Sequence, residues 1–138
     1  MSGLAFNTST PYGQSAVKGF GYTQAVRVGD VVHLSGQGGW KPEPPHDIFR
    51  DTIEQIDQAF RNVDAELRAA GVKNGWQAVY KVRSYHIPLN KEAEYIMVNN
   101  FKKWMPDHAP LWTCVGVTRL GEDDMRVEIE VEAYAPRE

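Results

Sequence analysis

The clearest pattern along the chain is an apolar stripe within residues 47–70. Apolar side chains recur there at alternating spacings of three and four positions: Ile53, Ile56, Phe60, Val63 and Leu67. This periodicity predicts an amphipathic helix. Asp47 or Asp51 is suited to cap its start, and Gly71 lies where a left-handed residue often ends a helix.

A second helix and five strands are predicted around this element. Apolar residues favour a helix over residues 91–105, which Pro106 ends, and β-rich runs favour strands over residues 25–28, 31–34, 78–86, 111–120 and 126–135. Gly29-Asp30 separates the first two strands and predicts a hairpin. The order ββαβαββ predicts an α+β (α/β sandwich) domain over residues 21–138. Residues 1–20, rich in Ser, Thr, Gly and Pro, are predicted to form an irregular arm.

The strand over residues 111–120 predicts self-association. Crossover connections are right-handed in nearly all proteins, so both helices are expected on one face of the sheet. Leu111, Val115 and Val117 nevertheless point to one side of this strand, and Trp112, Cys114 and Leu120 to the other. A strand that is apolar on both faces is normally buried on both. A second copy of the chain is the simplest cover, so we predict a homo-oligomer.

Composition narrows the class of protein further. The 138 residues carry a net charge of −3 and no concentrated basic face, which makes nucleic acid an unlikely partner. No apolar run approaches the ~20 residues that span a bilayer, and the N-terminal residues have no signal-peptide or transit-peptide pattern. With a single cysteine, these features predict a cytoplasmic protein. The four histidines show no metal-ligand spacing and no cofactor motif is present, so neither a metal nor a cofactor is expected.

Three features are candidates for chemistry. The glycines of Ser35–Gly39 either let backbone amides approach a ligand or simply meet unusual backbone dihedrals. Cys114 has no flanking cation and is interpreted as a small buried hydrophobe. Glu128, Glu130 and Glu132 alternate with apolar residues and share one face. Because like charges repel, at least one of these glutamates is expected to have a partner or a raised pKa.

Several segments together resemble the RidA/YjgF family. They are TQAVRVGDVVHLSGQ, the helix end ELRAAGV and the C-terminal stretch HAPLWTCVGVTRLGEDDMRVEIEVEAYA. The similarity runs from about Tyr22 to Ala135 in the family's order. The resemblance implies a chorismate-mutase-like fold, a homotrimer with ligand sites in clefts between subunits, and cofactor-independent hydrolysis of 2-imino acids or their enamine tautomers.

The resemblance also implies roles for individual residues. Glu128 matches the glutamate that positions the attacking water, Tyr22 the aromatic residue that closes the cleft, and Gly36 the backbone donor after the hairpin. Cys114 matches the cysteine that follows the family's substrate-binding arginine. The arginine position itself holds Trp112. Without the guanidinium, a 2-imino acid loses a bidentate anchor for its carboxylate. Trp112 either shapes an altered, more lipophilic pocket or packs at the subunit interface.

These considerations leave three functions. The first is a RidA-like hydrolase, similar to the 2-iminobutanoate/2-iminopropanoate deaminases, that acts on a small imine or enamine with altered specificity. The second is a non-catalytic trimer that binds small molecules or proteins, which the loss of the arginine motivates. The third, RNA cleavage, ranks last because the chain has no basic stripe.

Overall fold

The computed structural model describes residues 4–137, and among them six strands form one sheet of order β1-β2-β3-β6-β4-β5. The strands are β1 (Ala5–Asn7), β2 (Ala25–Val28), β3 (Val31–Leu34), β4 (Val79–His86), β5 (Leu111–Gly116) and β6 (Val127–Tyr134). The helices are α1 (Pro11–Phe20), α2 (Thr52–Ala69) and α3 (Lys91–Trp104), with a short 3-10 turn, η1, at Gly75–Ala78. Only β4 and β5 run parallel; the other neighbours are antiparallel.

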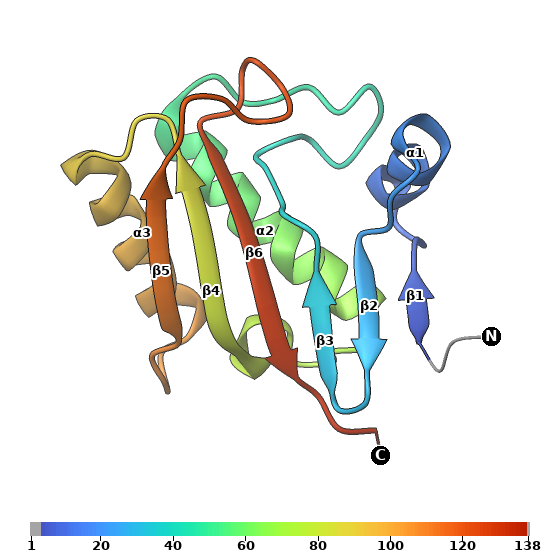
Figure 1. Ribbon diagram of the computed structural model, residues 1–138. Helices are drawn as coiled ribbons and strands as arrows, with labels where there is room; N and C mark the ends of the chain where they lie inside the picture. The colour runs from blue at the N-terminus through green and yellow to red at the C-terminus, as the bar shows by residue number, and fades with distance from the viewer. Residues whose placement is uncertain (1–3, 138) are drawn as a thin grey trace.

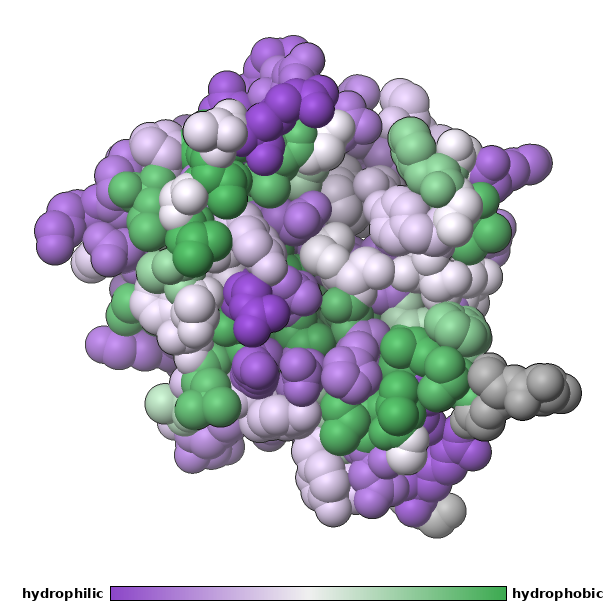
Figure 2. Space-filling view, in the orientation of Figure 1, coloured by the Kyte–Doolittle hydropathy of each residue, from purple (hydrophilic) through white to green (hydrophobic). Residues whose placement is uncertain are grey.

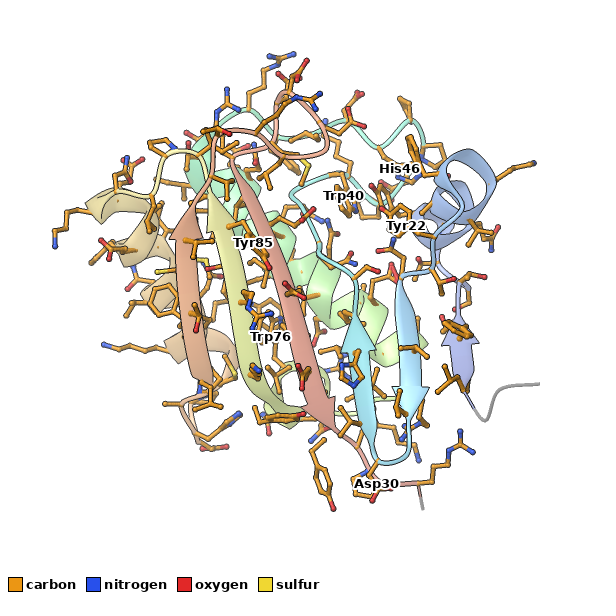
Figure 3. The ribbon with its side chains drawn as sticks, viewed as in Figure 1. Tyr22, Asp30, Trp40, His46, Trp76 and Tyr85 are labelled. Carbon is orange, nitrogen blue, oxygen red and sulfur yellow. The ribbon has the colours of Figure 1, made fainter. Side chains whose placement is uncertain are left out.

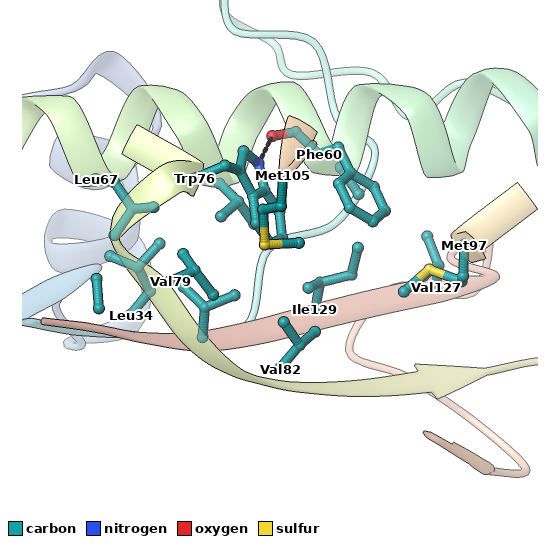
Figure 4. Packing of buried hydrophobic residues seen from close by; sticks show 14 of the residues in the cluster. Leu34, Phe60, Leu67, Trp76, Val79, Val82, Met97, Met105, Val127 and Ile129 are labelled. Atoms are coloured by element: carbon teal, nitrogen blue, oxygen red, sulfur yellow. Dashed lines mark hydrogen bonds between the residues drawn. The ribbon is translucent and has the colours of Figure 1, made fainter. Parts of the chain in front are cut away.

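Helices α2 and α3 cover the same face of the sheet, as the crossover rule predicts, and the other face is open (Figure 1). The hydrophobic core fills the layer between these helices and the strands (Figure 4). Trp76 is its largest fully buried side chain; its ring stacks on Phe60 and its indole nitrogen donates to the Phe60 carbonyl at 2.8 Å. The α+β architecture predicted from the sequence is confirmed.

The expectation of an irregular arm over residues 1–20 is wrong for most of its length. Residues 11–20 form α1, which lies at the far side of the molecule from α3 (Figure 1), and residues 5–7 form β1. Thr10 caps the helix by accepting a hydrogen bond from the Gly13 amide at 2.9 Å, and Pro11 occupies the first turn. Residues 1–3 lie outside the described residues.

The predicted helix over residues 47–70 is present but starts later. The Asp51 side chain accepts from the Glu54 amide at 3.0 Å, which fixes the start of α2 at Thr52. At the other end Gly71 adopts a positive φ of 92°, the left-handed conformation expected of it. Most of the predicted stripe is buried, but Ile53 in the first turn is exposed.

The predicted strand over residues 111–120 ends at Gly116. Its partner β4 ends at His86, whose carbonyl accepts the last bond, from the Val117 amide at 2.9 Å. Beyond it, Pro88 offers no backbone N–H to continue the ladder. β5 is therefore a short edge strand, and on the open face its Leu111 side chain is 65% exposed. The apolar surface that predicted self-association is uncovered within one chain.

Candidate functional site

Three glutamates project from the open face of β6, as the alternation predicts. Two of them accept hydrogen bonds from tyrosine hydroxyls, and Glu128 is the third. Glu132 accepts a hydrogen bond from the Tyr80 hydroxyl at 2.7 Å, and Glu130 accepts one from the Tyr85 hydroxyl. Glu128 is half-buried. Burial, and then the negative charge of Glu130, raise the pKa of the Glu128 carboxyl above its usual value.

The glycine loop after β3 lies directly against Glu128. Gln37 forms a two-way backbone bridge to Ile129, with N–O distances of 2.7 and 2.9 Å, and this fixes Gly36 beside the neighbouring Glu128. A Cβ atom on residue 36 would lie 2.5 Å from the Glu128 Cγ and Cδ atoms. Glycine at this position leaves the space to the glutamate side chain, and a larger residue would displace the carboxyl.

Two tyrosines complete this group. Gly21 ends α1 in the left-handed conformation with φ of 74°, and Tyr22 follows it, partly exposed. The Tyr12 hydroxyl lies beside Tyr22. Burial, Tyr22, and the charges of Glu122 and Glu128 together raise the pKa of the Tyr12 phenol well above its usual value. Figure 3 shows Tyr22 gathered with Trp40 and His46 between α1 and the sheet.

Sequence reasoning missed Tyr12. The signal that could have found it is the Thr10-Pro11 pair, a helix start that would have placed Tyr12 in the first turn of a helix rather than in an irregular arm.

Trp112 and Cys114 do not join this group within one chain. They lie on β5, which β4 separates from β6, and their side chains face α3 rather than the open face. The Trp112 indole nitrogen donates to the Ser84 Oγ atom at 2.9 Å, and the ring meets Phe101 of α3 edge-on at 5.0 Å. Within one chain Trp112 therefore lies apart from Tyr22, and the pocket expected between subunits stays a prediction.

The surroundings of Cys114 favour the thiol over the thiolate. Burial is the larger cause that raises its pKa, and the nearby Glu94 carboxylate adds to it. Among residues 4–137, no group of three or more His, Cys, Asp or Glu side chains is placed to hold a metal ion. In the same part of the chain no helix is long and apolar enough to cross a membrane.

The mixed sheet backed by two helices defines an α+β sandwich, and on its open face a glutamate lies against a glycine loop. A sequence model of the family described as Endoribonuclease L-PSP matches residues 13–135. The RutC family protein YjgH of Escherichia coli (strain K12) is 35% identical over 121 residues, which cover 85% of each chain. The chain belongs to the RidA/YjgF family.

Two further comparisons agree. A 2-iminobutanoate/2-iminopropanoate deaminase of Dermatophagoides farinae is 33% identical over 110 residues, covering 79% of this chain and 81% of the other. The solved structure of Protein YJGH superimposes with a TM-score of 0.78 at 28% identity, over 96% of this chain and 95% of that one. Both similarities extend across nearly the whole domain.

Proposed function

We propose that this chain hydrolyses a small imine or enamine and releases ammonia and a carbonyl compound. The observation that carries the proposal is the Glu128 carboxyl, half-buried on the open face and held against the Gly36 backbone. Such a carboxyl is suited to acid–base work, because burial raises its pKa above the usual value of a glutamate. The relative named a 2-iminobutanoate/2-iminopropanoate deaminase supports the reaction class.

The proposed reaction uses only water and this carboxyl. Ionised Glu128 accepts a proton from a water molecule as the water oxygen bonds to the imine carbon and the C=N π pair moves to nitrogen, and Glu128 then passes this proton to the nitrogen to give the carbinolamine. Glu128 next accepts the carbinolamine hydroxyl proton as the C=O bond forms and the C–N bond breaks, and it passes that proton to the departing nitrogen, so that ammonia leaves with the carbonyl product. An enamine enters the same sequence after it tautomerises to the imine.

The proposal includes a homotrimer whose neighbouring copy completes the site. Within one chain the Glu128 group and the Cys114 backbone lie on strands that β4 separates, and in the proposal a second copy brings such groups together around one ligand. Figure 2 shows hydrophobic residues gathered at the two sides of the open face, with hydrophilic residues between them. Sedimentation at micromolar concentration should give a trimer, and Leu111→Asp, which places a charge on this apolar edge, should weaken it. A monomeric wild type contradicts this part.

The proposed substrate differs from a simple 2-imino acid in how it is held. Trp112 stands at the family's arginine position, and its indole N–H is already used by Ser84. The chain therefore has no guanidinium at this place to pair with a substrate carboxylate. We expect the polar end of the substrate to bind backbone amides, at a cost in affinity for small anionic imines.

The experiment compares two glutamates on the same strand and face. Glu128→Gln should lower the rate of imine hydrolysis by about 100-fold or more, because a positioned acid–base group contributes that much. Glu132→Gln, four residues along β6, should stay within a few-fold of wild type. The assay uses freshly generated 2-iminopropanoate and 2-iminobutanoate. It measures how much the protein lowers the amount of each imine that semicarbazide traps. An equal loss in both variants, or in neither, refutes the role of Glu128.

A further inference from the structure

A cavity of about 500 Å³ lies between α1, the segment from Trp40 to Ile48, and the segment from Glu122 to Asp124. This is within the range of volumes that hold whole small ligands. The family resemblance assigns no residue to it. Tyr12, Phe20 and Trp40 contribute aromatic surface, and Ala16, Pro44 and Pro45 contribute the aliphatic part.

The aromatic wall of this cavity is rigid. The Tyr12 ring stacks on Trp40 with centroids 3.8 Å apart and planes 6° from parallel, and His46 meets the Tyr12 ring edge-on at 5.1 Å. Trp40 is almost fully buried, and its carbonyl accepts a hydrogen bond from the Asn62 side chain at 2.8 Å. A flat surface already fixed in place binds another flat group with little further loss of conformational entropy.

The ring of His46 is also held in place, by contacts of both its nitrogen atoms. Its Nδ1 atom donates to the Lys41 carbonyl at 2.9 Å, and its Nε2 atom lies 3.3 Å from the Ser15 hydroxyl of α1. His46 has a φ of 63°, which is uncommon for a residue other than glycine. Backbone strain of this kind persists where the surroundings fix the position, and it is concentrated at binding sites.

Tyr12 connects this cavity to the Glu128 site. Its ring forms part of the cavity wall, while its hydroxyl lies beside Tyr22 and within the electrostatic reach of Glu128. The Tyr12 side chain therefore reaches from the cavity wall toward Tyr22 and the Glu128 site. A substrate with a methyl side chain would leave the cavity unfilled.

The charges of the lining restrict the side chain further. Asp47, Glu122 and Asp124 line the cavity, and among the described lining residues none is a lysine or an arginine. Arg50 pairs with Asp124 at 3.3 Å, which leaves the other two carboxylates without such a partner in the lining. An anionic side chain is therefore disfavoured, and a neutral aromatic one fits both the shape and the charge.

We propose that the cavity between α1 and the Trp40–Ile48 segment is the side-chain subsite of the Glu128 site, and that it selects imines with a planar aromatic side chain. The inference rests on the proposed hydrolysis for its reacting end and adds the substrate class. Tyr12 is a specificity-determining residue in this arrangement, because its ring supplies the face against which the substrate stacks.

The test compares three imines that share one head group and differ only in side chain. These are 2-iminopropanoate with a methyl group, 2-imino-3-phenylpropanoate with a benzyl group, and 2-iminopentanedioate with an anionic side chain. We expect kcat/KM for the benzyl compound to exceed that for the methyl compound at least tenfold, with the anionic compound slowest. A methyl compound hydrolysed as fast as the benzyl compound overturns the inference.

Variants of Tyr12 test whether its ring determines the selectivity for the benzyl compound. Tyr12→Ala should bring the benzyl-to-methyl ratio close to one, whereas Tyr12→Phe, which keeps the ring, should preserve it. Tyr95→Ala is the matched control: this tyrosine also lies in a helix, but it is 68% exposed and far from the cavity lining. An unchanged ratio in Tyr12→Ala overturns the inference.

A binding measurement separates this inference from the hydrolysis itself. The indole N–H resonance of Trp40, assigned with Trp40→Phe, should shift when the keto acid 3-phenyl-2-oxopropanoate is added, and stay in place with 2-oxopropanoate. If no imine is hydrolysed but the Trp40 resonance shifts, the proposed reaction fails and the aromatic subsite stands. If imines are hydrolysed but the resonance does not move, the reaction stands and the subsite is refuted.

Discussion

Gly36→Ala tests whether the glycine loop positions the Glu128 carboxyl. The added Cβ would lie 2.5 Å from the Glu128 Cγ and Cδ atoms and 2.8 Å from Oε2. Ordinary contacts between carbon atoms are about 3.5–4.0 Å, so the end of the glutamate must retreat by roughly 1 Å. Residue 36 is not among those with positive φ, so its backbone accepts alanine. The substitution is therefore directed at the carboxyl rather than at the fold.

Gly36→Ala is expected to change the rate of hydrolysis much more than the free energy of unfolding. A misplacement of about 1 Å at a reacting group costs on the order of 100-fold in rate, equivalent to about 2.7 kcal/mol in the activation barrier. Stability should change by less than about 1 kcal/mol, because an off-rotamer glutamate costs about 0.5–1.5 kcal/mol and replacing glycine gains about 0.4–1 kcal/mol through the unfolded chain. We expect kcat to fall about 100-fold with the unfolding midpoint nearly unchanged.

The assay is imine hydrolysis in parallel with thermal unfolding. Gly19→Ala is the control, since nothing lies within 4 Å of a Cβ at that position. Full activity in Gly36→Ala would refute the claim that this contact positions the reacting carboxyl.

Two further predictions concern charge and packing. The value of kcat/KM should rise with pH as Glu128 ionises, because only the ionised form accepts a proton from water. Glu130→Gln removes a neighbouring negative charge, which lowers the pKa of Glu128 and should move that rise to lower pH. An unmoved profile contradicts the role of Glu128. Trp112→Arg should lower the free energy of unfolding by about 2 kcal/mol, because it replaces an aromatic ring packed on Phe101 with a partly desolvated cation. Unchanged stability in urea would show that Trp112 is not part of the packing against α3.

The elements that the sequence predicted are those whose local pattern agrees with their final packing. The stripe of α2 and the alternation of β6 each reflect one buried face, and both are confirmed. α1 was missed because two glycines, Gly13 and Gly19, weaken its helical pattern. That helix depends on its cap and on tertiary contacts instead: the Thr10 hydroxyl also donates to Glu66 of α2 at 2.7 Å.

The candidate site was accessible to sequence reasoning only in part. The contact between Gly36 and Glu128 depends on the Gln37–Ile129 bridge, which joins residues far apart along the chain. The pattern of residues along either segment does not determine which residues of the two segments pair. The parity of β5 correctly placed Trp112 and Cys114 on one side of the strand. Which side faces α3 follows from pairing with β4, where Val82 and Ser84 already face the helices.

Trp112, at the position where the resemblance implies an arginine, joins a buried polar chain. The Trp112 indole donates to Ser84, and the Ser84 hydroxyl lies 2.8 Å from the Nε2 atom of His86, which is fully buried. Burial lowers the pKa of His86 and so favours the neutral ring. A guanidinium would have to share this space with a desolvated imidazole. Trp112 thus packs the edge of the sheet against α3. In the proposed site, substrate selection is therefore assigned to another element. α1 is placed to provide it, because Tyr12 is the residue that lies both beside Tyr22 and on the wall of the aromatic cavity.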